Sequence, residues 1–360
     1  MNRPILYIAI TNHGFGHITR TVSIANTIQK LCPEILLILV TTAPRWLLEL
    51  YISGDFILRQ RAFDVGVVQA DSLKMDKQAT LEKLREINKK QHSLIASEVN
   101  FIQQNRVNLI LADIPFLAAA FAQTAGVPCW MLGNFGWDFI YREWLGEFTE
   151  IADWISAWYS KSDRLFRLPF HEPMQDFENI TDVGLTGGTP RFSSEEIRAT
   201  WGITAPKEQT VLLTFGGLDL QQIPYHNIQN FPDWQFITLD PSAPNLPNLI
   251  KATNRKYRPV DFMPICNRVI SKPGYGTFSE ATRLGIPIVT IPRDDFAEAQ
   301  FLLEGIQNFN YHQIITPEDF FQANWNFLYQ PPQPPKQPQP LAKDGNEQIA
   351  TEVINYLRNL

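Results

Sequence analysis

The first residues able to do chemistry stand in a glycine-punctuated turn near the amino terminus. His17 follows Gly14, Phe15 and Gly16, where a short apolar run gives way to an amphipathic stretch. Glycine lets a substrate approach the backbone closely, and the positive end of a helix dipole favours a neutral imidazole. A neutral imidazole suits a general base that takes a proton from a hydroxyl group. Two alternatives for His17 are a ligand contact without proton transfer and a helix-capping role.

A carboxylate follows another apolar run and could assist this histidine. Asp113 comes directly after the run 107–112. The carboxyl ends of parallel strands form the ligand side of a doubly wound sheet, so Asp113 should emerge there. We expect it to orient His17 or to bind the acceptor of the reaction. A helix N-cap is the alternative for this residue.

A second glycine-bracketed turn, at 271–281, follows the expected strand 268–270. A loop that opens a helix offers free amides and a positive dipole end to a diphosphate. Glu280, one turn into that helix, suits hydrogen bonds from ribose hydroxyls, and an exposed helix carboxylate is the alternative. The donor-binding residues that we expect from this turn are Lys272, Gly274, Tyr275, Gly276, Thr277, Ser279 and Glu280.

Two further segments complete the expected donor side. Gly216 and Gly217 end an apolar run and either form another wall of the diphosphate site or make an ordinary tight turn. Asp295 and Glu298 follow the run 287–291 and either hold sugar hydroxyls or belong to a solvated loop. No D-x-D pattern ends an apolar run. We therefore expect no metal ion and no cofactor, with a nucleotide-sugar as co-substrate.

The order of the segments predicts the fold that positions these residues. Short apolar runs alternate with amphipathic stretches in both halves of the chain, which is typical of doubly wound parallel sheets. The G-x-G-H spacing lacks the full dinucleotide fingerprint, and no acidic residue ends the second apolar run, so NAD is disfavoured. We expect an α/β protein with two Rossmann-like domains facing a cleft.

The length of the chain and its glycine-rich and proline-rich stretches indicate how it divides into domains. Its 360 residues exceed what one hydrophobic core usually organises. The glycine-rich stretch 184–190 suits a hinge, and the proline-rich stretch 331–340 suits an extended spacer. We expect an acceptor domain over 1–186, a donor domain over 187–330, a linker over 331–340, and a terminal helix in 341–360 that packs back on the body.

Composition argues against several partners. The formal net charge of -6 removes the general attraction to nucleic acid and to anionic membranes. No apolar stretch approaches the ~18 residues of a membrane span, and the amino terminus lacks a signal-peptide pattern. The three cysteines form no C-x-x-C pair. We expect a cytoplasmic protein with no nucleic-acid partner; no feature supports membrane contact, and a lipid-linked acceptor stays open.

Four strings of sequence resemble one family, the glycosyltransferase-like N-terminal region of plant L-arabinokinases and their stand-alone bacterial relatives. The strings lie in both halves of the chain, at 12–20, at 134–141, at 274–281, and at 293–296 with Glu298. More distantly, the turn at 271–281 is similar to that of the GlcNAc transferase that makes the lipid-linked peptidoglycan precursor. The resemblance implies a GT-B fold, a UDP-sugar donor, ribose contacts by Glu280 and diphosphate contacts by the amides around Gly276 and Thr277.

Residues and resemblance together predict a metal-independent glycosyltransferase that moves a sugar from a UDP-sugar to an unidentified acceptor. They do not separate hexosyl, pentosyl and N-acetylglucosaminyl transfer. No phosphate loop of a sugar kinase occurs, so we expect no kinase domain. A non-catalytic nucleotide-sugar sensor and a UDP-sugar 2-epimerase remain alternatives. The expected catalytic residues are His17 and Asp113. The expected acceptor or cleft residues are Gly14, Phe15, Gly16, Arg20, Asn134, Trp137 and Asp138.

Overall fold

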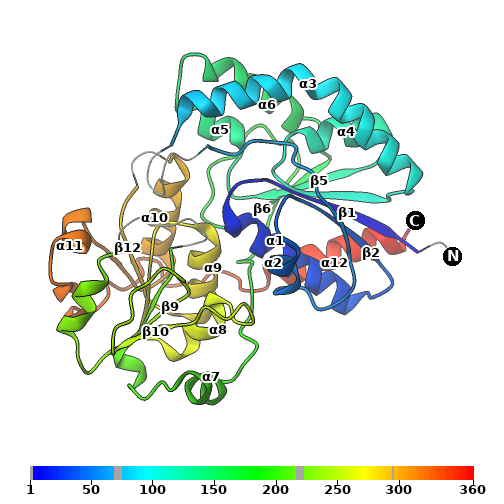
Figure 1. The fold of residues 1–360 in the computed structure, drawn as a ribbon. Helices are drawn as coiled ribbons and strands as arrows, with labels where there is room; N and C mark the ends of the chain where they lie inside the picture. The colour runs from blue at the N-terminus through cyan, green and yellow to red at the C-terminus, as the bar shows by residue number, and fades with distance from the viewer. Residues whose placement is uncertain (1–2, 69–74, 216–222, 294–295) are drawn as a thin grey trace. The chain divides into compact units, whose positions relative to one another are not determined.

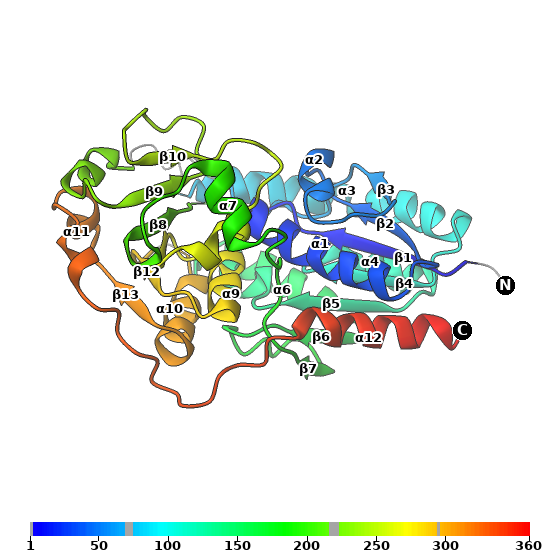
Figure 2. The same ribbon diagram turned by 90° about the horizontal axis from the view of Figure 1, so that it is seen from below.

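The computed structural model describes residues 3–68, 75–215, 223–293 and 296–360, which fall into two compact α/β units. The first unit comprises the described chain up to Gly187 together with Ala342–Leu360, and the second comprises Gly188–Leu341. Each unit is built on one parallel sheet (Figures 1 and 2). Three expected donor-side residues lie outside the described residues: Gly216, Gly217 and Asp295.

In the described part of the first unit, seven strands form a sheet in the order β3-β2-β1-β4-β5-β6-β7. β1, β4 and β5 are buried along nearly their whole length because helices cover both faces of the sheet (Figure 1). The strands are β1 (Ile5–Ile10), β2 (Leu36–Val40), β3 (Ile57–Arg59), β4 (Leu109–Asp113), β5 (Cys129–Gly133), β6 (Arg164–Arg167) and β7 (Ile180–Asp182). The helices are α1 (Gly14–Leu31), α2 (Arg45–Glu49), α3 (Lys77–Gln104), α4 (Leu117–Ala125), α5 (Trp137–Arg142), α6 (Phe148–Tyr159) and α12 (Gly345–Arg358).

The described part of the second unit has a six-stranded sheet in the order β10-β9-β8-β11-β12-β13. Its strands are β8 (Thr210–Leu213), β9 (Gln235–Thr238), β10 (Leu249–Lys251), β11 (Arg268–Ser271), β12 (Ile288–Thr290) and β13 (His312–Ile314). Its α-helices are α7 (Ser194–Trp201), α8 (Pro259–Phe262), α9 (Tyr275–Leu284), α10 (Glu298–Phe309) and α11 (Pro317–Phe321), beside 3₁₀ turns at Lys207–Gln209, Tyr225–Asn230, Met263–Ile265 and Asn326–Tyr329. The two Rossmann-like parallel sheets confirm the predicted fold class.

The first turn of α1 differs from the expected free loop. The helix begins at Gly14, so Gly14, Phe15 and Gly16 belong to the helix and His17 is its fourth residue. Gly14 has a φ of 63°, in the left-handed region that glycine adopts without steric cost. The glycine therefore serves the entry of the chain into the helix.

The C-terminal helix packs on the first unit, where α12 contacts α1 (Figure 1). At its start a Cβ atom on Gly345 would lie 2.0 Å from the carbonyl oxygen of Gly184, so this backbone crossing requires glycine. The preceding proline-rich stretch is bonded to the second unit and is not a free spacer. Gln333 and His312 exchange backbone hydrogen bonds of 2.7 and 3.0 Å. Proline has no N–H, so the residues between the prolines supply the donors.

Candidate functional site

The first group of site residues lies where the strand order of the first sheet reverses. β1 and β4 are neighbours there, and their carboxyl ends meet at one edge of the sheet. Asp113 is the last residue of β4, and its Oδ1 lies 2.9 Å from Nδ1 of His17. The capping alternatives do not hold, because Phe116 is the N-cap of α4 and His13 that of α1.

Arg20 lies at the centre of this group. Its Nε donates to Oδ2 of Asp113 at 2.7 Å, and its Nη2 donates to Oδ1 at 2.6 Å. Its Nη1 donates to Oδ1 of Asn134 at 2.7 Å. Arg20 and Asn134 are each 1% exposed, so they hold the group from inside the protein and do not line its surface. Both were expected among the acceptor or cleft residues.

Charge and burial together leave the imidazole neutral. Burial lowers the pKa of His17, and Arg20 lowers it further, against the opposing effect of Asp113. Burial alone would raise the pKa of Asp113, but Arg20 and His17 outweigh it and hold that pKa well below its usual range. At neutral pH the carboxylate and the guanidinium are charged and His17 is not. A neutral imidazole is the form that a general base requires.

Aromatic rings enclose one side of His17. Its ring is 5.5 Å from that of Phe135 and 6.3 Å from that of Trp137. Trp137 is fully buried and donates from Nε1 to the hydroxyl of Thr11 at 3.0 Å, so it supports the site from behind. Phe15 is 38% exposed, and Gly14 and Gly16 are exposed as well. The first turn of α1 is therefore the accessible surface beside His17.

Two carboxyl groups near this site are buried. Asp138 is 5% exposed, and burial, followed by a hydrogen bond with Asp176, raises its pKa well above its usual value. Asp64, which sequence reasoning missed, accepts hydrogen bonds from the backbone N–H of Asn12 at 3.0 Å and from the hydroxyl of Thr11. Burial raises the pKa of Asp64 to about 6. Asp64 lies in a loop that carries no motif, so no sequence signal indicated it.

The second group surrounds the amino terminus of α9, directly after β11. The N-cap is Gly274, which has no side chain to cap the first-turn amides. Burial, followed by the charge of Arg293, lowers the pKa of Lys272 to about 8. Within the described chain no carboxylate pairs with Lys272, and the buried hydroxyls of Ser271 and Thr290, on adjacent strands, have no hydrogen-bond partner. A helix amino terminus whose N-cap provides no side chain, beside two cations, makes a site for an anion.

Glu280 stands in the second turn of α9. Its Oε1 accepts a hydrogen bond of 2.7 Å from the backbone N–H of Gly188. Burial raises its pKa to about 7, against the lowering effects of that hydrogen bond and of Arg258 and Arg283. The exposed-carboxylate alternative does not hold, because Glu280 is 5% exposed. Other predicted donor-side residues at buried positions in this unit are Tyr275, Gly276, Ser279 and Glu298, and Thr277 is half-buried.

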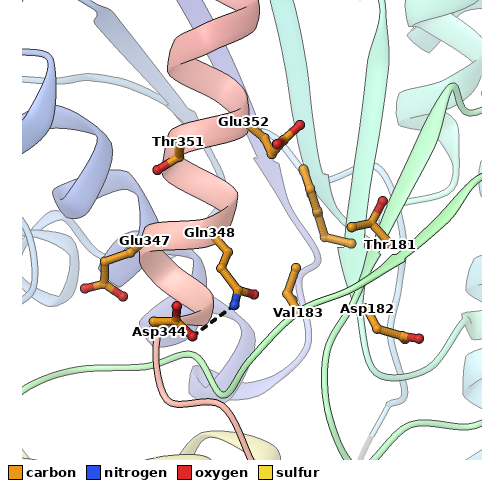
Figure 3. A pocket seen from close by; sticks show the side chains of 9 residues that line it. Thr181, Asp182, Val183, Asp344, Glu347, Gln348, Thr351 and Glu352 are labelled. Atoms are coloured by element: carbon orange, nitrogen blue, oxygen red, sulfur yellow. Dashed lines mark hydrogen bonds between the residues drawn. The ribbon is translucent and has the colours of Figure 1, made fainter.

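A separate hollow of about 450 Å³ lies between α12 and the strands β6 and β7 of the first unit (Figure 3). Its acidic lining is already paired in part, since Asp182 binds Arg167 and Glu352 binds Arg164, each at 2.7 Å. None of the predicted site residues lines it. No three His, Cys, Asp or Glu side chains gather as a metal site would need anywhere in the described ranges, and no helix in those ranges is long and apolar enough to span a membrane.

Comparison with known proteins agrees with this fold. No family model matches the chain. The chain is 30% identical to L-arabinokinase of Arabidopsis thaliana over 327 residues, 88% of this chain, and it spans only 31% of that protein's length. The GT-B fold is shared with the solved glycosyltransferase of kitacinnamycin, at 14% identity and a TM-score of 0.61, over 99% of this chain and 96% of that one. It is shared with the calicheamicin glycosyltransferase CalG4, at 16% identity and a TM-score of 0.61, over 100% of this chain and 93% of that one. It is also shared with a UDP-glucose:anthocyanidin 3-O-glucosyltransferase solved with UDP, at 11% identity and a TM-score of 0.61, over 99% of this chain and 94% of that one.

The buried carboxyl of Glu280 generates a testable pH dependence of stability. Its pKa of about 7, against an ordinary 4.5, means that the folded state retains a proton that the unfolded state has lost. The stabilisation from this proton is complete below pH 4.5 and is lost as the pH rises through 7. Glu280→Gln should therefore gain stability relative to the wild type between pH 4 and 9, by about 3 kcal/mol.

Urea unfolding across this pH range measures the difference between the two proteins. Glu304→Gln, at an exposed position on α10 in the same unit, is the matched control and should run parallel to the wild type. A Glu280→Gln curve that also runs parallel to the wild type would contradict the burial effect.

Proposed function

We propose that the chain is a metal-independent glycosyltransferase that takes a sugar from a UDP-sugar and transfers it to a hydroxyl acceptor. The observation that carries this proposal is the amino terminus of α9, whose N-cap Gly274 has no side chain, with Lys272 before it and Glu280 one turn within it. A diphosphate is the leaving group of a nucleotide-sugar. Fixed amides and a cation in a buried site stabilise the charge that develops on such a group.

Different donor-side residues would bind the diphosphate and the ribose of the nucleotide. First-turn amides of α9 and the ammonium of Lys272 would bind the diphosphate. Oε1 of Glu280 already accepts a hydrogen bond from the backbone N–H of Gly188. No residue of the described chain donates a hydrogen bond to Oε2. A ribose hydroxyl would donate to that oxygen. A bound diphosphate would raise the pKa of the half-buried Lys272 and keep its ammonium charged, against the lowering effects of burial and of Arg293.

The acceptor half of the reaction is assigned to His17. With Nδ1 beside Asp113, the second ring nitrogen, Nε2, is the atom that would accept a proton from the attacking hydroxyl. The exposed first turn of α1 would form part of the acceptor surface through Phe15 and the glycine backbone.

Comparison with solved structures supports this proposal. The glycosyltransferases with the same fold include one solved with UDP and another solved with UDP-2-fluoro-glucose. A UDP-sugar is therefore the donor class to test first.

Calorimetric titration tests the donor site directly. We expect UDP and one or more UDP-sugars to bind, in preference to GDP, ADP, dTDP and NAD, with unchanged affinity in EDTA. Lys272→Met should weaken UDP binding by roughly tenfold to hundredfold, because a charge-assisted contact is lost. Lys207→Met, at an exposed lysine of the same unit, should bind UDP normally. Absence of binding by every nucleotide would refute the proposal, and strict dependence on a divalent ion would refute its metal-independent form.

Replacement of His17 separates an enzyme from a nucleotide-sugar sensor. His17→Ala should slow release of UDP from the bound UDP-sugar, with water or an acceptor as nucleophile, by about 10²–10⁴-fold. Its affinity for UDP should not change, because His17 lies in the other unit. His92→Ala, at an exposed histidine of α3, is the control. A wild-type protein that binds a UDP-sugar but never releases UDP from it would favour the sensor.

A further inference from the structure

The guanidinium of Arg20 lies beside both His17, the predicted base, and Asp113, the carboxylate next to it. Three atoms of three side chains lie within 2.9 Å of one another. Nη2 of Arg20 is 2.6 Å from Oδ1 of Asp113 and 2.8 Å from Nδ1 of His17, and those two partners are 2.9 Å apart. Nη2 can only donate and Oδ1 can only accept, whereas the ring nitrogen can do either. The position of one ring proton therefore decides what His17 can do.

The carboxylate favours a proton on Nδ1. Oδ2 of Asp113 accepts from Nε of Arg20 and from the hydroxyl of Thr21 at 2.6 Å, and Oδ1 accepts from Nη2. An ionised carboxylate has about four lone-pair positions, so a fourth donor, N–H of Nδ1, completes the set. With the proton there, Nε2 of His17 is unprotonated. No residue of the described ranges forms a hydrogen bond with Nε2, which leaves it for a ligand.

We propose that Arg20 is a positioning residue that keeps His17 neutral, while Asp113 holds the ring proton on Nδ1 and so leaves the acceptor nitrogen Nε2 available. A second ring proton would create an imidazolium 2.8 Å from the guanidinium, and two like charges at this distance repel strongly. Asp113 cannot compensate fully, because Arg20 already binds both of its oxygens. Asp113 thus orients the imidazole, but it stabilises the protonated imidazolium less than a carboxylate without a bound arginine would.

Few other titratable groups of the described residues lie near His17. His13 lies at a ring distance of 6.4 Å, and Asp64 is connected to the site through Thr11. The remaining neighbours are the uncharged rings of Phe135 and Trp137. Burial and the charge of Arg20 lower the pKa of His17, in the same direction as the geometric argument. The inference rests on the proposed function only for the use that the reaction makes of Nε2.

Nitrogen-15 NMR of histidine-labelled protein tests this role without any ligand. The chain has six histidines, and the His17 signals are assigned by their loss in His17→Gln. In the wild type we expect a neutral ring at pH 7 with the proton on Nδ1. In Arg20→Gln the carboxylate faces the imidazole alone, so the pKa of His17 should rise by about one unit. Arg59→Gln breaks another ion pair of this unit, between half-buried Arg59 and buried Glu98, and should leave the His17 titration unchanged.

Arg20→Lys is the second variant if Arg20→Gln does not fold, since lysine keeps a charge but lacks the fork that binds both oxygens. A raised pKa of His17 in either folded variant supports the proposal. An unchanged or lowered pKa of His17 in the folded variant overturns it, and so does a wild-type ring with its proton on Nε2. Because the measurement uses neither donor nor acceptor, a failed UDP titration and a failed tautomer assignment are separate results.

Discussion

Parallel strands impose the constraint on which both candidate sites depend. Each strand must be followed by a crossover, so the carboxyl ends of the strands and the amino termini of the following helices gather at one edge of each sheet. In the first unit this edge holds His17 and Asp113, after β1 and at the end of β4. In the second unit it holds Lys272 and the start of α9, after β11. Two sheets with the same order of their first six strands thus present two different sets of side chains.

The two edges differ in how their charges are balanced. In the first unit Arg20 and Asp113 neutralise one another in a fully buried pair, and the group that remains for chemistry is a neutral imidazole. Such a site suits an uncharged hydroxyl. In the second unit Lys272 and Arg293 repel one another beside the positive end of a helix. Such a site is stabilised by an anion, so the two units are suited to the two partners of a glycosyl transfer.

The sequence predicted the long central elements and their order, because buried parallel strands are continuously apolar and their crossover helices are amphipathic. It did not predict β6, which has four residues, or β3, β7, β10 and β13, which have three residues each and lie at the sheet edges. It also missed the start of α1 at Gly14, because glycine is unfavourable in helices and two glycines close together favour the prediction of a turn.

The site was predicted where a residue type follows a strand end, as for His17, Asp113 and Lys272. Contacts between distant segments gave no signal. Asp64 meets the end of β1 from an unpatterned loop, and the link from Arg20 to Asp113 and Asn134 spans more than 90 residues of sequence. A sequence motif marks such residues as a group, but only the folded chain shows that Arg20 and Trp137 support the site from inside.

The crystal structure of the protein with UDP tests the central claim most directly. We predict that the diphosphate binds at the first-turn amides of α9 and the ammonium of Lys272, with a ribose hydroxyl bonded to Glu280. UDP bound elsewhere, with the amino terminus of α9 free of phosphate, would contradict the donor-site assignment.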